Sequence, residues 1–125
     1  LNKQEMVFLN AKKKTNLDPI EFAVNAEKMG AGEIVINSVN RDGTMKGYDL
    51  KMIQDFYDKV STPITVIGGA SDYKDFVELG KKFPVIGAGA GSLFVFKGKY
   101  RAVLINYPSL EEKNNIINEI REYYA

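Results

Sequence analysis

The residues best suited to chemistry gather in one stretch, Asn40 to Leu50, with the sequence NRDGTMKGYDL. This stretch follows the apolar run EIVIN, so we interpret it as a loop at the end of a buried strand. An acid in that position can donate or accept a proton, which makes Asp42 a candidate catalytic residue. Asp followed by Gly is also common in simple turns, so a purely structural role for Asp42 before Gly43 stays open.

Two further loops are rich in glycine. GGAS, residues 68–71, follows the apolar run ITVI, and GAGAGS, residues 87–92, follows the next apolar run. Glycines allow backbone N–H groups to approach an oxyanion closely, and two such loops on successive strands can surround one phosphate. The alternative is that these glycines serve only tight turns and close packing. The predicted phosphate-binding residues in these loops are Gly68, Gly69, Gly91 and Ser92.

The composition excludes several kinds of site. The chain contains no Cys and no His. Disulfides, thiolate chemistry, imidazole metal ligands and His-based catalytic dyads or triads are therefore excluded. Acid–base catalysis would depend on Asp, Glu, Lys or Tyr. The sequence predicts no metal site and no cofactor.

Charge and length narrow the choice of partners. Lys and Arg total 17 against 16 Asp and Glu, a formal net charge of +1, which argues against nucleic acid or an anionic membrane surface as a partner. No apolar run approaches the roughly 18 residues that span a bilayer, and no signal peptide is evident. The 125 residues suffice for one core and not for two, so we expect a single unit over residues 1–125.

An alternation of strands and helices must position the three loops. Apolar runs at 6–10, 33–37, 64–67 and 85–89 predict strands, and helices are expected after the N-caps Asp18, Asp49, Ser71 and Ser109. Residues 6–10 are expected to pair, if they form a hairpin, with the residues before them, and AKKKTN is expected to be a basic loop. The alternation indicates an α/β fold of parallel βα units, whose chemistry gathers at the carboxyl edge of the sheet.

With these motifs described, the chain resembles the C-terminal half of the cyclase subunit of imidazole glycerol phosphate synthase, a histidine-biosynthesis (βα)₈ barrel. The most specific segment is EKMGAGEIVINSVNRDGTMKGYDLKMI, and PITVIGGAS, GAGAGSLFVF and EMVFLNAKKKTN extend the similarity over most of the chain. The resemblance implies that residues 1–125 form half of a TIM (βα)₈ barrel.

The resemblance also implies roles for individual residues. It assigns phosphate binding to Thr44 and support of catalysis to Asp42, and it implies that the turns at Gly68, Gly69, Gly91 and Ser92 hold phosphates. The implied reaction is that of a cytoplasmic lyase. It uses ammonia from a glutamine amidotransferase subunit to split and cyclise a phosphorylated substrate, a ribulosyl-formimino aminoimidazole carboxamide ribonucleotide.

Several features depart from the family pattern. Asn40 stands where the family usually has Asp, and Ile67 replaces a small polar residue. The segment FKGKYRAVLINYPS is similar to cyclase paralogues associated with surface polysaccharide, thought to transfer ammonia to a sugar. The family's two principal catalytic aspartates would precede Leu1, so a non-catalytic phosphate-binding half-barrel is a further alternative.

The resemblance leads to an expectation about assembly. The chain begins with Leu1 and strand-like residues, so we expect a piece of a longer protein. A half-barrel of four βα units would leave two unpaired strand edges and apolar inward faces. These faces are expected to include Val35, Ile64, Val66 and Ile86. A two-fold homo-oligomer or the missing N-terminal half would cover them, and the alternative is that RAVLINY caps one edge of a monomer.

Overall fold

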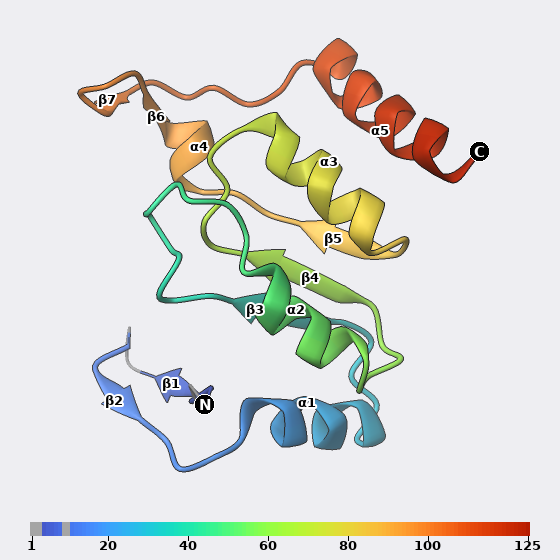
Figure 1. The fold of residues 1–125 in the computed structure, drawn as a ribbon. Helices are drawn as coiled ribbons and strands as arrows, with labels where there is room; N and C mark the ends of the chain where they lie inside the picture. Colours follow the sequence, from blue (N-terminus) through green and yellow to red (C-terminus); the bar gives the residue numbers. More distant parts are fainter. Residues whose placement is uncertain (1–3, 9–10) are drawn as a thin grey trace.

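The central element is a parallel sheet, as predicted. The computed structural model describes residues 4–8 and 11–125. Its sheet has the order β3-β4-β5, formed by β3 (Ile34–Asn37), β4 (Ile64–Ile67) and β5 (Ile86–Ala88) (Figure 1). Both pairings are parallel, with Ile34 opposite Ile64 and Ile64 opposite Ile86. The α/β fold class is therefore confirmed.

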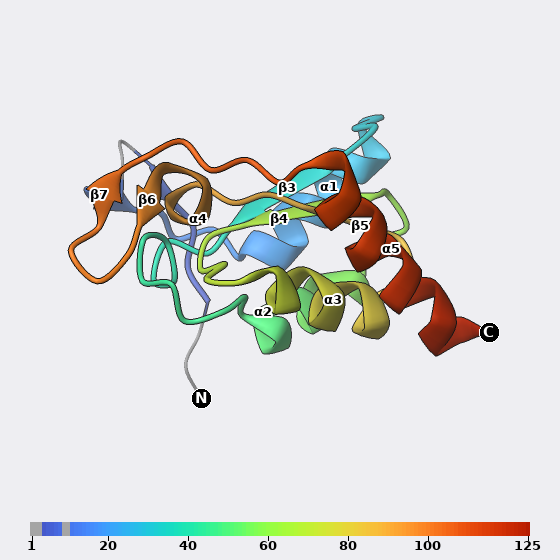
Figure 2. The ribbon, with the colours of Figure 1, turned by 90° about the horizontal axis from the view of Figure 1, so that it is seen from above.

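Helices connect the strands and cover one face of the sheet (Figure 2). These are α1 (Pro19–Lys28), α2 (Leu50–Tyr57) and α3 (Tyr73–Lys82). The single turn α4 (Ser92–Val95) follows β5, and the C-terminal helix α5 (Leu110–Tyr124) packs against α3. In the described residues, no helix combines the length and apolar character needed to cross a bilayer.

The core lies between the sheet and these helices. Alternate strand residues Ile36, Ile64 and Val66 are buried on the helix side. The helices contribute Ile53 from α2 and Leu79 from α3, both 1% exposed or less. This face follows from the period-two alternation of each strand and the apolar stripe of each helix.

The predicted helix starts are confirmed except at α3. Asp18 accepts hydrogen bonds from the N–H groups of Ile20 and Glu21, and Asp49 accepts one from Met52. Ser109 and Glu112 form the reciprocal capping box of α5.

The prediction of Ser71 as the cap of α3 is wrong. Asp72 is the N-cap, and its carboxylate accepts a hydrogen bond from Lys74 N–H. The Ser71 hydroxyl donates instead to Asp75, 2.8 Å away. A carboxylate one residue later in the chain therefore takes the capping position.

The face of the sheet opposite the helices is open. The register sets Val35 opposite Thr65, and Thr65 opposite Gly87, so these three share that face. Val35 is 57% exposed there, whereas Ile64 is 3% exposed on the helix side. Of the four residues predicted to lie on the exposed inward face, Val35 lies on the open face, whereas the prediction is wrong for Ile64, Val66 and Ile86, which lie on the helix side. Parallel pairing in this register places Val35 one residue out of phase with the other three.

The parallel sheet has three strands in the described residues, not one from each of the four units predicted. β3 and β5 each pair only with β4 there. The RAVLINY run lies against α4 and not along either edge of the sheet. Leu104 N–H donates to Val95 O, and Asn106 N–H donates to Phe94 O. It does not cap the sheet as the monomer alternative required. The oligomeric state stays a prediction.

Two antiparallel hairpins flank the sheet. β1 (Val7–Phe8) pairs with β2 (Lys13–Lys14), so the strand near residues 6–10 pairs with residues after it, and part of AKKKTN is a strand rather than a loop. Leu9 and Asn10 of that prediction lie outside the described residues. The second hairpin joins β6 (Phe96–Lys97) to β7 (Ala102–Val103), and Gly98 in its turn has a left-handed φ of +74°.

Candidate functional site

The loop after β3 begins with a hydrogen-bonded turn and then leads to α2 through a segment that is hydrogen-bonded to the loop after β4. The N–H groups of Arg41 and Asp42 both donate to Ser38 O, at 2.9 and 2.8 Å. Gly43 completes the turn with φ of +71°, where glycine is favoured. The chain therefore turns at the Asp42–Gly43 pair, and the Asp42 side chain is exposed.

Arg41 and Thr44 stabilise this loop from within. The Arg41 guanidinium donates to Lys46 O at 3.0 Å. The Thr44 hydroxyl donates to Arg41 O at 2.7 Å, which leaves its lone pairs but not its proton for another partner. Both side chains therefore shape the loop, and a ligand would meet Thr44 chiefly as an acceptor or after its hydroxyl rotates.

The glycine pair after β4 packs against the β3 loop. Gly47 N–H donates to Gly69 O at 2.9 Å. A Cβ at Gly69 would collide with the carbonyl oxygen of Gly47, and one at Gly68 would lie 2.8 Å from Ser38 O. Both glycines are buried, with φ of +93° for Gly68 and +108° for Gly69. Close packing alone therefore explains why these two positions are glycine.

The N-terminus of α3 is satisfied by its own carboxylates. Asp75 Oδ2 accepts from Ser71 N–H at 2.6 Å, from the Ser71 hydroxyl at 2.8 Å and from Asp72 N–H at 3.1 Å. A phosphate at this end would have to displace a negative group that already fills the position. The donors for an external anion must lie elsewhere on this edge.

The loop after β5 has a different character. A Cβ at Gly91 would meet no heavy atom of the described chain within 4 Å, and Gly91 is exposed. Packing therefore does not require glycine there, unlike at Gly68 and Gly69. The close approach of a ligand is a physical reason that remains.

Tyr48 ties the β3 loop to the β5 loop. Its hydroxyl donates to Gly89 O at 2.8 Å, and the side chain is 7% exposed. Burial is the larger cause, and the negative charge of Asp75 the smaller one, that raises the pKa of the Tyr48 phenol well above its ordinary value. Tyr48 therefore stays protonated at neutral pH and acts as a fixed donor, not as a base.

The β3 loop and the start of α4 meet directly. A Cβ at Gly43 would lie 3.9 Å from Ser92 Oγ. Figures 1 and 2 both show the β3 loop beside α4 and the β6–β7 hairpin. From that hairpin Arg101 Nη2 reaches Gly43 O at 3.2 Å and Ser92 Oγ at 3.4 Å. Gly43, Gly91 and Ser92 therefore form, with Arg101, a small polar cluster at the carboxyl edge of the sheet.

Sequence reasoning found most members of this edge but not Arg101. It singled out Asp42, Thr44, Gly68, Gly69, Gly91 and Ser92, and the structure places all of them in the three strand-end loops except Ser92, which is the first residue of α4. Arg101 lies in the β6–β7 turn, and no sequence signal indicates that this turn folds back onto Ser92. The described residues contain no group of three or more acidic side chains close enough to hold a metal ion.

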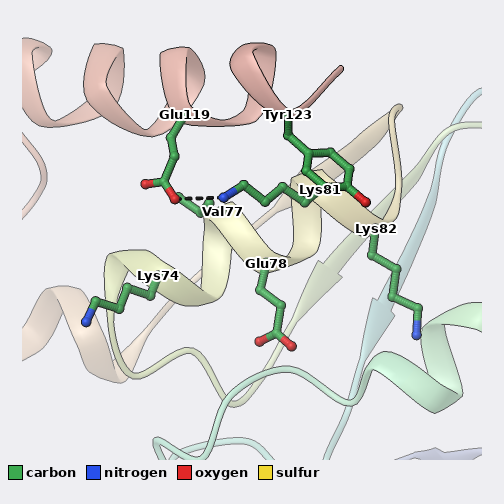
Figure 3. A pocket seen from close by; sticks show the side chains of 7 residues that line it. All are labelled: Lys74, Val77, Glu78, Lys81, Lys82, Glu119 and Tyr123. Atoms are coloured by element: carbon green, nitrogen blue, oxygen red, sulfur yellow. Dashed lines mark hydrogen bonds and ion pairs between the residues drawn. The ribbon is translucent and has the colours of Figure 1, made fainter. Parts of the chain in front are cut away.

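A separate hollow lies between α3 and α5 (Figure 3). Its lining includes Lys74, Glu78 and Lys82, and a 2.8 Å ion pair joins Lys81 to Glu119. These are long, mostly exposed side chains on two packed helices, remote from the carboxyl edge of the sheet. The hollow has the character of an ordinary helix–helix surface.

Comparison with known proteins identifies the family. Residues 2–101 match the family described as histidine biosynthesis protein. The chain belongs to this family. Its membership confirms the resemblance inferred from the β3 loop and the glycine turns, and the match ends at Arg101, so the residues beyond the β6–β7 turn lie outside it.

The related proteins have closely similar names. A Vibrio vulnificus protein named "Putative imidazole glycerol phosphate synthase subunit hisF3" is 50% identical over 109 residues, which are 87% of this chain and 42% of the relative. A Leptospira interrogans protein named "Putative imidazole glycerol phosphate synthase subunit HisF" is 46% identical over 114 residues, 90% of this chain and 45% of the relative. "Imidazole glycerol phosphate synthase subunit HisF" of Francisella philomiragia is 37% identical over 110 residues, 86% and 40% of the two chains.

This histidine biosynthesis family member spans less than half the length of these curated relatives. Its alternating βα units cover about 40% of a HisF barrel.

Proposed function

We propose that this chain is the phosphate-binding part of a HisF-type cyclase. One observation carries the proposal: the loops after three neighbouring parallel strands meet at the carboxyl edge, with Gly43 beside Ser92 and Gly47 bonded to Gly69. Ligands of parallel α/β folds bind at that edge. The proposed phosphate contacts are Thr44, Gly68, Gly69, Gly91 and Ser92.

The proposed reaction is that of imidazole glycerol phosphate synthase. Ammonia released from glutamine by an amidotransferase partner splits and cyclises the ribulosyl-formimino aminoimidazole carboxamide ribonucleotide. Asp42 is the proposed accessory proton donor or acceptor, since its exposed carboxylate projects from a turn held rigid by two hydrogen bonds to Ser38 O. The remainder of the barrel supplies the principal acid and base.

A second function is favoured by a specific feature. The family match stops at Arg101, where the β6–β7 hairpin folds over the polar cluster. A different hairpin at the mouth of the same barrel would admit a different acceptor for ammonia, such as a sugar of a surface polysaccharide. The third alternative, a phosphate-binding half-barrel without catalysis, shares the anion site and lacks the reaction.

The anion site is tested by titration with ribose 5-phosphate. We expect the backbone amide signals of Gly43, Gly91 and Ser92 to shift at millimolar ligand, because the glycines allow close approach and Ser92 adds a hydroxyl donor. Ser92→Ala should weaken binding by about threefold to tenfold, the effect of one hydrogen bond. The matched control Ser61→Ala, an exposed serine of the α2–β4 loop, should change nothing. If the backbone amide signals of all three loops stay unchanged during the titration, the proposal is wrong.

The catalytic part is tested by assaying the purified chain with the ribonucleotide and ammonium. We expect no turnover, because one accessory acid cannot replace a principal acid–base pair. The assay follows release of imidazole glycerol phosphate. Product formation that disappears in Asp42→Asn would contradict this expectation and would make Asp42 the principal catalytic residue of this chain.

A further inference from the structure

Arg101 is a strongly basic side chain that contacts the polar cluster. It lies in the β6–β7 turn, 58 residues from Gly43 in the sequence, and its Nη2 contacts both Gly43 O and Ser92 Oγ. A surface arginine is most often simply solvated. This one makes contacts to two other elements, which gives it a defined place at the mouth of the site.

The guanidinium is held in position by an aromatic ring. The Arg101 Cζ atom lies 4.8 Å from the centroid of the Phe96 ring, within the range of a cation–π contact. The Arg101 backbone has φ of +50°, a left-handed conformation that costs energy for a residue other than glycine. The ring and the two contacts of Nη2 therefore define the position of the guanidinium beside Gly43 and Ser92.

The charge of Arg101 has no anionic partner in the part of the chain that the structure describes. The ion pairs found there join Lys14 to Glu5 and Lys81 to Glu119. The two contacts of Arg101 are long and go to neutral oxygens through one of its three nitrogens. Arginine presents five N–H donors in a planar fork, which suits an oxyanion far better than a single carbonyl.

Arg41 does not compete for this role. It is the basic residue that the sequence of the β3 loop brings to attention, but its guanidinium donates to Lys46 O within its own loop at 3.0 Å. Arg101 reaches the cluster from outside, at the point where Gly43 and Ser92 meet. Of these two arginines, Arg101 is the one directed at both loops.

We propose that Arg101 is a substrate-binding residue that contacts the phosphate group of a phosphorylated substrate at Gly43 and Ser92. The inference rests on the proposed phosphate site and adds a contact that comes from the β6–β7 hairpin. The contacts of Nη2 to Gly43 O and Ser92 Oγ position the guanidinium, and its other N–H groups are the donors that a phosphate oxygen beside Ser92 would meet. A phosphate with oxygens in several directions can accept from the guanidinium fork and from the Ser92 hydroxyl together.

The placement makes the hairpin a determinant of specificity. Arg101 is the last residue of the family match, and the residues that follow it, from β7 onward, lie outside that match. A charged contact from this hairpin would select substrates whose phosphate lies against α4. The same barrel with another hairpin would lose this contact while keeping its glycine turns.

The test compares binding of ribose 5-phosphate to the unmodified chain and to variants, with the amide signals of Gly43 and Ser92 as readout. Loss of a charge-assisted contact in Arg101→Ala should weaken binding about tenfold to a hundredfold. Arg101→Lys, which keeps the charge and loses the fork, should have an intermediate effect. The matched control Lys99→Ala removes an exposed charge from the same turn and should leave the dissociation constant within twofold.

The outcomes separate this inference from the function on which it rests. If ribose 5-phosphate binds the unmodified chain and Arg101→Ala equally strongly, the role of Arg101 is overturned and the proposed phosphate site is not. Absence of binding to the unmodified chain overturns both. An equal loss in Arg101→Ala with unphosphorylated ribose as the probe would also overturn the inference, since the effect would not depend on phosphate. Unchanged signals of the core amides of Val66 and Leu79 show that each variant is folded.

Discussion

Gly69→Ala is expected to lower the free energy of unfolding by about 3 kcal/mol or more, the largest effect of any single methyl group considered for this chain. Two causes act together. The Gly69 backbone has φ of +108°, which a residue with a Cβ adopts only under strain, and the new methyl group would collide with the carbonyl oxygen of Gly47. Relief by moving the β3 loop would break the hydrogen bond from Gly47 N–H to Gly69 O.

Urea unfolding followed by circular dichroism measures this effect. Gly32→Ala is the matched control, because a Cβ there meets no heavy atom of the described chain within 4 Å and the backbone is not left-handed. The control should change the free energy of unfolding by less than about 0.5 kcal/mol, as surface substitutions usually do. Equal midpoints for the two variants would show that the β3 and β4 loops are not packed as described.

Phe83→Ala is expected to cost about 3–5 kcal/mol, the usual range for removing a buried phenylalanine. Phe83 directly follows α3, is 1% exposed, and packs its ring 5.0 Å from that of Tyr57 on α2. Its removal leaves a cavity where two βα units meet, and the surrounding elements can close it only by shifting helices against the sheet. We expect the thermal unfolding midpoint to fall by well over 10 °C or the chain not to fold.

Phe22→Ala provides the comparison for Phe83. Phe22 lies on α1 and is 50% exposed, so truncation removes the same ring without opening a comparable cavity. A thermal melt should show a shift of a few degrees at most. If Phe83→Ala and Phe22→Ala have the same thermal unfolding midpoint, the junction of α2 and α3 is not the packed centre of the fold.

Much of the fold follows from local sequence signals. Asp18, Asp49 and Ser109 start helices because each carboxylate or hydroxyl satisfies N–H groups that the first helical turn leaves free, and this chemistry depends only on near neighbours. Ser71 and Asp72 show the limit of such reasoning. Two adjacent residues could both cap α3, and the choice depends on Asp75, which holds Ser71 in a different role.

Long-range geometry could not be predicted in the same way. The face to which Val35 belongs depends on the register between β3 and β4, and alternation within one strand does not determine that register. The glycine turns were recognised as special, but their sequence does not distinguish Gly69, which packs against Gly47, from Gly91, which faces open space. Arg101 escaped notice because its approach to Gly43 spans 58 residues and depends on the direction of a hairpin.

Two hydrogen bonds that hold the β3 loop affect the thermodynamics of ligand binding. Gly47 N–H donates a hydrogen bond to Gly69 O, and the Tyr48 hydroxyl donates one to Gly89 O. The C-terminal part of this loop is therefore joined to the loops that follow β4 and β5 before any ligand binds. Ordering the backbone of a free loop costs roughly 1–2 kcal/mol of conformational entropy for each residue. This loop has already lost most of that freedom on folding. An anion that enters between Gly43 and Ser92 therefore meets a preorganised surface, and the energy of its contacts appears as affinity instead of being consumed by ordering the protein.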